Sequence, residues 1–241
     1  MAGNHGPARD CSQDGAQDSA LTGTLADALE GALLNPWMTA RDARLHLVRW
    51  EELGIRRVVA LPWILSQFDV ASFPSIEFAG AVSFPTGCGT MTNKRVELLE
   101  CVKLGARAAS VVLTPGVILS ADATSIEKEI VQLLSTASDL RVRLVVDLAR
   151  VPDDALSVLI RILKDVRPSH IVTADGVFGE PCCAVRVSWL RARLTKKVRI
   201  LAFAPVSDPT GARAYLDAGA DILCTPHPER LFSVPSVGGA P

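Results

Sequence analysis

Two apolar runs end in polar residues whose types suit acid–base chemistry. The run "VRLVVD" ends at Asp147, and "SHIVTADGVFGE" carries Thr173 and Asp175 just beyond its apolar half. A carboxylate at the end of an apolar run is partly removed from water, which suits a general acid or base. For each carboxylate a structural alternative stays open. Asp147 could instead accept hydrogen bonds from the backbone of the next loop, and Asp175 could instead belong to an ordinary Asp-Gly turn. These residues predict proton transfer to a substrate, provided that the fold brings them together.

Further polar and aromatic residues follow other apolar runs and could complete the same site. Ser110 and Thr114 supply hydroxyl groups, Trp63 and Phe203 could form aromatic walls, and Cys88, Lys94 and His227 could contact a ligand. A helix start beyond Cys88 would favour its thiolate, with His227 as a partner only if the two loops meet. Among the lysines, Lys94 alone is expected near this site, and its alternative is a surface lysine at a helix start.

The six cysteines show neither a disulfide framework nor a metal-binding pattern. Cys11, Cys88, Cys101, Cys182, Cys183 and Cys224 are scattered without a CxxC pair. Zinc sites and disulfide frameworks both have tighter spacing, so reduced thiols are expected, with a redox-active Cys182-Cys183 pair as the alternative. No group of histidines and carboxylates has ligand spacing either. The sequence therefore predicts metal-independent chemistry with no cofactor.

Near-continuous apolar runs, rather than alternating ones, indicate parallel strands that are covered on both faces. Eight such runs alternate with helical patterns, at residues 29–34, 57–62, 79–84, 109–114, 142–147, 169–174, 198–203 and 220–224. This count predicts an α/β protein with a single-domain (β/α)8 TIM barrel, whose active site lies at the carboxyl ends of the strands. A doubly wound open sheet is the alternative, but it usually carries a GxGxxG after its first strand, and none is present here.

Capping residues mark where the helices between these runs begin. Helix starts are expected at Thr39, Thr92, Thr124 and Asp208, with another helix opened by Pro152. Thr39 and Thr124 each have a carboxylate three residues on, which makes a capping box, and Asp208 is followed by proline at the first helical position. The local signals therefore agree with alternating strands and helices.

Composition fits a globular protein and disfavours several classes of partner. The 241 residues are 49% hydrophobic and 21% charged, with a net charge of -1. The charge balance and the lack of a long basic cluster argue against nucleic-acid binding, and no apolar run approaches the roughly 18 residues that suggest a membrane span. We expect a flexible polar tail over 1–24, a barrel over 25–231 and a second tail over 232–241. A cytoplasmic location is expected because the N-terminal stretch lacks the apolar segment of a signal peptide.

Several ordered landmarks resemble the deoxyribose-phosphate aldolase family over about residues 29–231. These are "LEGALLNP" at the first strand, "AVSFPTGCGTMTNKRVELLECVKLGA" at the third strand and its turn, "DGVFG" after the sixth strand and "ARAYLDAGADIL" near the end. The resemblance implies a TIM-barrel aldolase, a lyase that forms a Schiff base through a lysine on strand six. It also implies a second lysine on strand seven, an aspartate on strand four and a phosphate site.

The sequence departs from the family at each of these positions. The Schiff-base lysine falls on Thr173, the second lysine on Leu201 and the aspartate on Ser110. In the phosphate site, Ala204-Pro205 and "TPHP" (225–228) stand where the resemblance implies glycines and small hydroxyl residues, and each proline removes an N–H donor. The departures predict a divergent member that lacks the Schiff-base lysine and does not favour phosphorylated sugars.

Two functions follow, and the sequence leaves both open. The first is an enzyme that binds a small carbonyl or polar metabolite and performs lyase, isomerase or cyclase chemistry by acid–base catalysis. The second is a pseudoenzyme, a ligand sensor or partner subunit without catalysis. A small-molecule ligand is expected in either case, and a homo-oligomer or a complex with another protein stays open. A short final segment after "PERLF" could leave one flank of the barrel exposed to such a partner.

Overall fold

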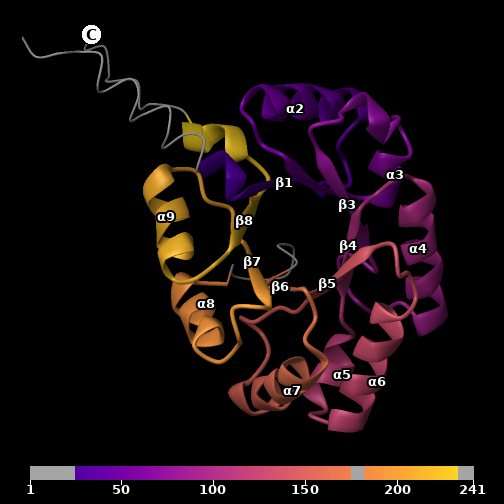
Figure 1. The fold of residues 1–241 in the computed structure, drawn as a ribbon, viewed down its shortest axis with the longest axis vertical. Coiled ribbons are helices and arrows are strands. Elements are labelled where there is room, and N and C mark those ends of the chain that lie inside the picture. The colour runs from indigo at the N-terminus through magenta and orange to yellow at the C-terminus, as the bar shows by residue number, and fades with distance from the viewer. Residues whose placement is uncertain (1–24, 175–181, 233–241) are drawn as a thin grey trace, which may run out of the picture.

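The computed structural model describes residues 25–174 and 182–232, which form a closed barrel of eight parallel strands (Figure 1). The strands pair in chain order and β8 closes on β1. Their bounds are β1 Leu29–Leu33, β2 Arg57–Ala60, β3 Glu77–Val82, β4 Ala108–Val112, β5 Arg141–Val145, β6 His170–Val172, β7 Arg199–Phe203 and β8 Ile222–Thr225. This architecture confirms the predicted single-domain (β/α)8 barrel.

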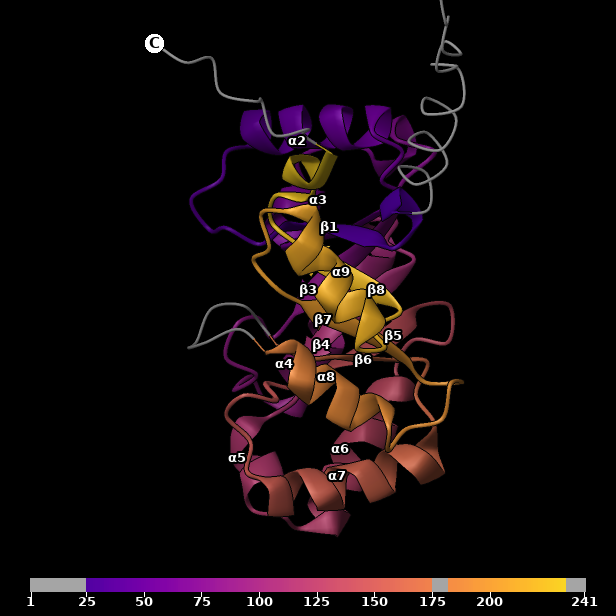
Figure 2. The ribbon, with the colours of Figure 1, turned by 90° about the vertical axis from the view of Figure 1, so that its left-hand side faces the viewer.

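Helices follow the strands and cover the outside of the barrel (Figures 1 and 2). The α-helices are α2 Ala40–Glu52, α3 Pro62–Leu65, α4 Met91–Lys103, α5 Pro115–Leu119, α6 Ala123–Leu134, α7 Asp153–Val166, α8 Ala184–Arg191 and α9 Pro209–Asp217. Two 3-10 helices, η1 Val70–Ser72 and η2 Pro228–Phe232, complete the set. Within the described residues, the short η2 follows β8. None of the described helices is long and apolar enough to cross a membrane.

Each predicted strand is present, with its ends displaced by at most two residues. The strands are buried almost throughout because their outward side chains pack under helices and their inward ones fill the barrel. The apolar runs outlast the backbone pairing. For example, β6 ends at Val172, although the apolar run continues to Ala174. Hydrophobicity thus located the strands, while backbone pairing set their ends.

Two of the predicted helix starts are confirmed and two are wrong. Thr39 forms the expected capping box with Asp42, and Asp208 caps α9 with Pro209 in its first turn. However, α4 begins after Thr90 rather than Thr92, and α6 begins after Asp122 rather than Thr124. In both helices an earlier side chain accepts the free N–H groups of the first turn, so the helix starts sooner. The fifth expected start is close, since Pro152 is the residue immediately before α7.

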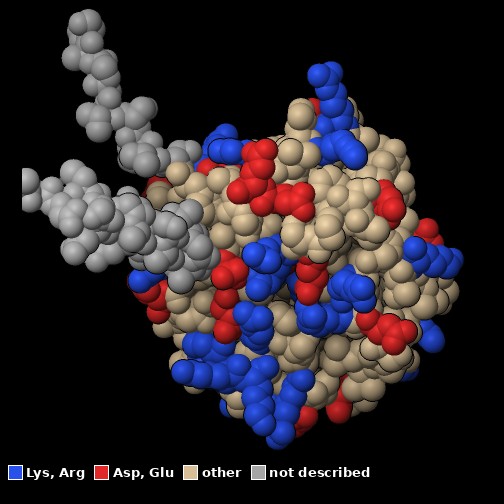
Figure 3. Space-filling view, turned by 45° about the horizontal axis from the view of Figure 1, so that its top comes forward, with Lys and Arg blue, Asp and Glu red and all other residues tan. Residues whose placement is uncertain are grey.

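A buried ion pair crosses the interior of the barrel. Arg143 on β5 donates to Glu30 on β1, which lies on the opposite side of the barrel, and also contacts Glu77 at 3.3 Å. Burial, together with the positive charges of Arg143 and Arg199, lowers the pKa of the neighbouring His170 imidazole to about 3. Charged groups thus occupy part of the interior, and His170 lies at the start of β6. On the outer face in Figure 3, Lys and Arg side chains lie among Asp and Glu side chains.

Candidate functional site

A cavity of about 320 Å³ opens beside the carboxyl ends of β4 and β5. Its walls are aliphatic and come from Val112, Leu113, Ile118, Leu119, Val145 and Val151, while Thr86, Asp147 and Arg150 supply polar groups. The helices α5 and α7 lie side by side next to it (Figures 1 and 2). A larger hollow of about 430 Å³ lies near η1 and the end of α4. It includes residues at the start of β3, whereas active sites of barrels lie at the opposite end of the strands. We therefore take the β4–β5 cavity as the candidate site.

Asp147 follows β5 directly and lines this cavity. Its Oδ1 accepts the backbone N–H of Ala149 at 3.1 Å, and its backbone carbonyl accepts the N–H groups of Arg150 and Val151. Both features expected from the sequence are therefore present: the carboxylate reaches a cavity, and it also accepts a hydrogen bond from the next loop. The backbone contact fixes the orientation of the carboxylate, which a catalytic acid or base requires.

The interior of the barrel, in contrast, is almost full. The inner cavity, centred among the strands, has a volume of only about 20 Å³, which suffices for about one water molecule. Leu34, Phe84, Val145, Val172, Leu201 and Phe203 fill most of it, with Glu30, Ser110 and Cys224 as its polar members. Ser110 and Phe203 therefore line the same inner cavity, whereas Asp147 lines the separate β4–β5 cavity. A substrate-sized space exists beside the barrel axis and not on it.

Thr173 is fully buried and its hydroxyl already has a backbone partner. Oγ1 accepts the N–H of Phe203 at 3.3 Å. From the same segment, Val172 and Ala174 line the inner cavity. The hydroxyl therefore helps to join β6 to β7, and its predicted catalytic role stays a prediction. Asp175, the other candidate in this segment, lies outside the described residues.

None of the chain's six lysines lines the β4–β5 cavity or the inner cavity. Lys94 was expected near the mouth, with a surface lysine as the alternative. The surface alternative is wrong, because the side chain is only 1% exposed. Lys94 reaches inward from the first turn of α4, where the closing of the barrel brings α6 and the end of β4 against it.

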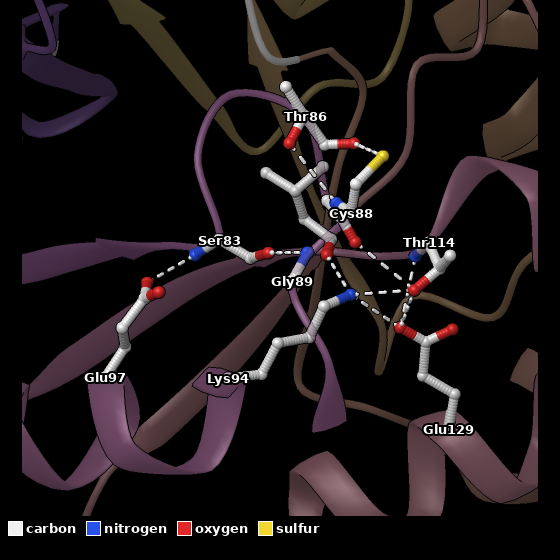
Figure 4. A network of polar contacts seen from close by, with 10 residues as sticks. Ser83, Thr86, Cys88, Gly89, Lys94, Glu97, Thr114 and Glu129 are labelled. Carbon is white, nitrogen blue, oxygen red and sulfur yellow. Dashed lines mark hydrogen bonds and ion pairs between the residues drawn. The ribbon is translucent and has the colours of Figure 1, made fainter. Parts of the chain in front are cut away.

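The ammonium group of Lys94 is held by three oxygen atoms (Figure 4). Nζ lies 2.7 Å from Glu129 Oε1, 2.8 Å from the carbonyl of Val112 and 3.0 Å from Thr114 Oγ1. Glu129 comes from α6 and is 7% exposed, so the ion pair is buried outside the strand barrel. Thr114 completes the network by donating its backbone N–H to the same Glu129 oxygen at 3.1 Å. Lys94 and Thr114, both predicted ligand contacts, thus meet each other and line a separate outer cavity.

A hydrogen bond joins the turn between β3 and α4 to Thr114 of this network (Figure 4). Thr114 Oγ1 lies 3.2 Å from the carbonyl of Gly87, and Glu97 accepts the backbone N–H of Ser83 at 2.6 Å. Gly87 has a φ of +67°, and a Cβ there would lie 2.4 Å from the carbonyl oxygen of Leu113. Only glycine allows this close approach of the turn to the end of β4. The approach also fixes Thr86, which reaches the wall of the candidate cavity.

The remaining predicted residues lie apart from the candidate cavity. Trp63 is on α3 and 52% exposed. Cys88 is exposed, with its thiol 3.3 Å from the carbonyl of Thr86. His227 Nδ1 lies 3.4 Å from a carboxylate oxygen of Glu229, so among the described residues it contacts a carboxylate rather than the expected cysteine. Across residues 25–174 and 182–232, no group of three or more histidines, cysteines and carboxylates could hold a metal ion.

Two residues that shape these sites were not selected from the sequence. Arg150 follows Asp147 by three residues and lines the β4–β5 cavity. A charged residue so close to the end of a strand could have been predicted as part of the site. Glu129 lies in the middle of a helix, 35 residues from Lys94, and no spacing rule connects them.

The fold and the cavity define the class of the chain as a (β/α)8 barrel with a small apolar cavity at the carboxyl ends of its strands. No protein-family model matches the sequence. The deoxyribose-phosphate aldolase of Caldanaerobacter subterraneus subsp. tengcongensis is 23% identical over 202 residues, which cover 82% of this chain and 87% of that protein.

Solved structures of aldolases share the fold of this chain. The deoxyribose phosphate aldolase of Aeropyrum pernix, described as a unique tetramer, aligns with a TM-score of 0.78 and 21% identity over 94% of this chain and 97% of that one. An aldolase called QR15 aligns with a TM-score of 0.81 and 17% identity over 86% and 94% of the two chains. Sequence and fold together make the chain a divergent relative of the deoxyribose-phosphate aldolases, as the resemblance predicted.

Proposed function

We propose that the chain binds a small carbonyl compound in the β4–β5 cavity and acts on it by acid–base chemistry at Asp147, without a Schiff base. One observation carries the proposal: among the residues that the structure describes, Asp147 and Arg150 are the ionisable ones that line this cavity, and no lysine joins them. A carboxylate can remove a proton next to a carbonyl group and return it elsewhere. Lyase, isomerase and cyclase reactions all use such a transfer.

The positions that the resemblance assigns to the aldolase mechanism support this proposal. A threonine hydroxyl at position 173 cannot form an iminium, and Leu201 cannot adjust the pKa of a neighbouring amine. The inner cavity, which Leu201 and Ser110 both line, has room for about one water molecule and none for a sugar. Pro205 also lacks the N–H that a phosphate group would need at this point. A small unphosphorylated ligand in the β4–β5 cavity requires neither a Schiff-base lysine, nor space inside the barrel, nor a phosphate site.

A second candidate is a non-catalytic ligand sensor or partner subunit, and specific contacts favour it. Asp147 Oδ1 accepts the N–H of Ala149, and the hydroxyl of Thr173 accepts the N–H of Phe203. Both side chains thus have a structural use that needs no catalysis. The cavity would still bind a ligand in this case, so binding alone does not separate the two functions.

Two measurements test the proposal. Borohydride treatment in the presence of aldehydes or ketones, followed by intact-mass analysis, should give no adduct on any lysine. Nuclear magnetic resonance should detect exchange of the protons next to the carbonyl group of a bound ketone or oxo acid with deuterated solvent. Asp147→Asn should slow this exchange about 100-fold or more, the range expected for loss of a general base.

Asp154→Asn provides the matched control. Asp154 also accepts a backbone N–H, that of Ala155 at 2.8 Å, but it does not line the cavity. Its replacement should leave the exchange rate unchanged. A lysine adduct, or equal rates in the Asp147→Asn and wild-type proteins, would refute the acid–base proposal. Binding without any exchange in the wild-type protein would favour the sensor.

A further inference from the structure

The polar edge of the β4–β5 cavity combines one carboxylate and one guanidinium on a single turn. The backbone N–H groups of Arg150 and Val151 both bind the carbonyl of Asp147, so the chain turns tightly here. As a result, Asp147 and Arg150 face the same small cavity. Ligand groups that meet both side chains must therefore be close neighbours in the ligand.

The guanidinium of Arg150 is available for an anion. Arg150 is exposed and forms no ion pair with any carboxylate in residues 25–174 or 182–232. Its planar group matches a carboxylate with two parallel hydrogen bonds. A phosphate dianion is less suitable, because the neighbouring Asp147 carboxylate would repel its two negative charges and a single arginine would have to offset them.

The rest of the cavity is aliphatic. Ile118 and Leu119 from α5 face Val145 from β5 and Val151 from the following loop. Cavities of about 300 Å³ are at the small end of those that hold ligands. Such walls stabilise a compact branched or aromatic group through removal of its surface from water, and they offer no partners for the hydroxyl groups of a sugar.

From these three features we propose that the ligand is an unphosphorylated 2-oxo acid with a branched or aromatic body. The inference rests on the proposed function and names its substrate class. A 2-oxo acid has its carbonyl group next to its carboxylate, which matches the adjacent Asp147 and Arg150. Its body occupies the aliphatic part of the cavity, between α5 and the end of β5.

The corresponding reaction step is an enolisation. The Asp147 carboxylate takes a proton from C3 of the ligand, and the electron pair of the C3–H bond forms a C2=C3 double bond. The carbonyl oxygen receives the negative charge, which the nearby guanidinium of Arg150 stabilises. Return of the proton from Asp147 to C3 restores the 2-oxo acid, so the step needs no oxidant, reductant or second reactant. In deuterated water the proton held by Asp147 exchanges with the solvent before the return step, so deuterium replaces the C3 protons.

Calorimetric titration of the full chain with four compounds tests the ligand class. The probes are 4-methyl-2-oxopentanoate, the neutral ketone 4-methyl-2-pentanone, pyruvate and deoxyribose 5-phosphate. The branched oxo acid should bind at least about tenfold more tightly than each of the others, because they lack its carboxylate, its branched body or both. Equal affinity for the ketone would overturn the role of Arg150, and equal affinity for pyruvate would overturn the role of the apolar walls.

Arg150→Gln should weaken binding of 4-methyl-2-oxopentanoate about tenfold, in the range of one charge-assisted hydrogen bond, and leave binding of the ketone unchanged. Arg161→Gln is the matched control, since Arg161 is exposed on α7 and does not line the cavity. This variant should bind every probe as the wild-type protein does. A similar loss in both variants would overturn the proposed contact.

Exchange of the C3 protons separates this inference from the proposed function. If the oxo acid binds in an Arg150-dependent way without deuterium exchange, the ligand class stands and the acid–base proposal fails. If the neutral ketone exchanges as fast as the oxo acid and binds as tightly, the ligand class fails and the acid–base proposal stands. If none of the four compounds binds, both are overturned.

Discussion

Replacement of Lys94 by methionine should destabilise the protein strongly. Lys94 and Glu129 are 1% and 7% exposed, so the substitution would leave a carboxylate buried without its cation. Removal of one partner of such a pair typically costs about 3–5 kcal/mol of unfolding free energy. The typical stability of a whole domain is only about 5–15 kcal/mol. The variant should therefore unfold at a clearly lower urea concentration, with an unchanged dependence on denaturant.

A double variant shows whether the unpaired charge is the cause. In Lys94→Met/Glu129→Gln neither partner of the buried pair carries a charge. The backbone N–H of Thr114, which donates to Glu129 at 3.1 Å, can donate to the glutamine oxygen instead. Part of the lost stability should return. A deficit of about 1–3 kcal/mol should remain, because the carbonyl of Val112 loses its hydrogen-bond donor.

Lys103→Met is the control for loss of a lysine as such. Lys103 lies on the same helix, is 74% exposed and pairs with Glu100 at 3.5 Å. Exposed pairs contribute about 0–1 kcal/mol, so this variant should unfold close to the wild-type midpoint. Equal midpoints for Lys94→Met and Lys103→Met would refute the buried pair. A double variant less stable than Lys94→Met would refute the unpaired charge as the cause.

Two further predictions concern the barrel interior and the turn after β3. The folded protein holds the pKa of His170 at about 3, well below the value near 6.5 of an unfolded chain, so between these values only the unfolded state binds the proton. Stability should therefore fall as the pH is lowered from about 6.5, by at most about 1.4 kcal/mol per pH unit from this group. His170→Gln should reduce this loss in urea melts between pH 7 and 5, and an identical slope in both proteins would contradict it. Gly87→Ala should cost at least about 1–3 kcal/mol, because it combines a positive φ with a clash against the Leu113 carbonyl. Gly116→Ala, where an added Cβ meets nothing within 4 Å, is its control and should unfold like the wild-type protein.

Most of the fold could be predicted because it depends on features that are local in the sequence. Apolar runs of strand length, separated by capped helices, already specify alternating elements and a parallel sheet. The errors occurred where two local signals competed. Thr92 is an adequate cap, but Thr90 two residues earlier is the one whose side chain accepts the N–H of Asn93.

The site could be predicted only in part, because its shape depends on contacts between distant segments. The position of Asp147 at the cavity could be anticipated, since active sites of barrels lie at the carboxyl ends of the strands and Asp147 follows β5 directly. The burial of Lys94 was not, because it requires α6 to bring Glu129 against α4. The closure of the barrel interior was not either, since it follows from how Phe84, Leu201 and Phe203 pack together.

The filled interior has a consequence for attempts to place a reactive lysine on the barrel axis by substitution. Apolar side chains such as Leu201 each contribute on the order of 1.5–3 kcal/mol when fully buried. A lysine at this position would remove that contribution and would also bring a charge into a space with room for about one water molecule. The centre of the barrel thus serves as core, and the stability gained there opposes the introduction of a charged group on the axis. New activities in this scaffold should be easier to obtain beside α5, where space already exists.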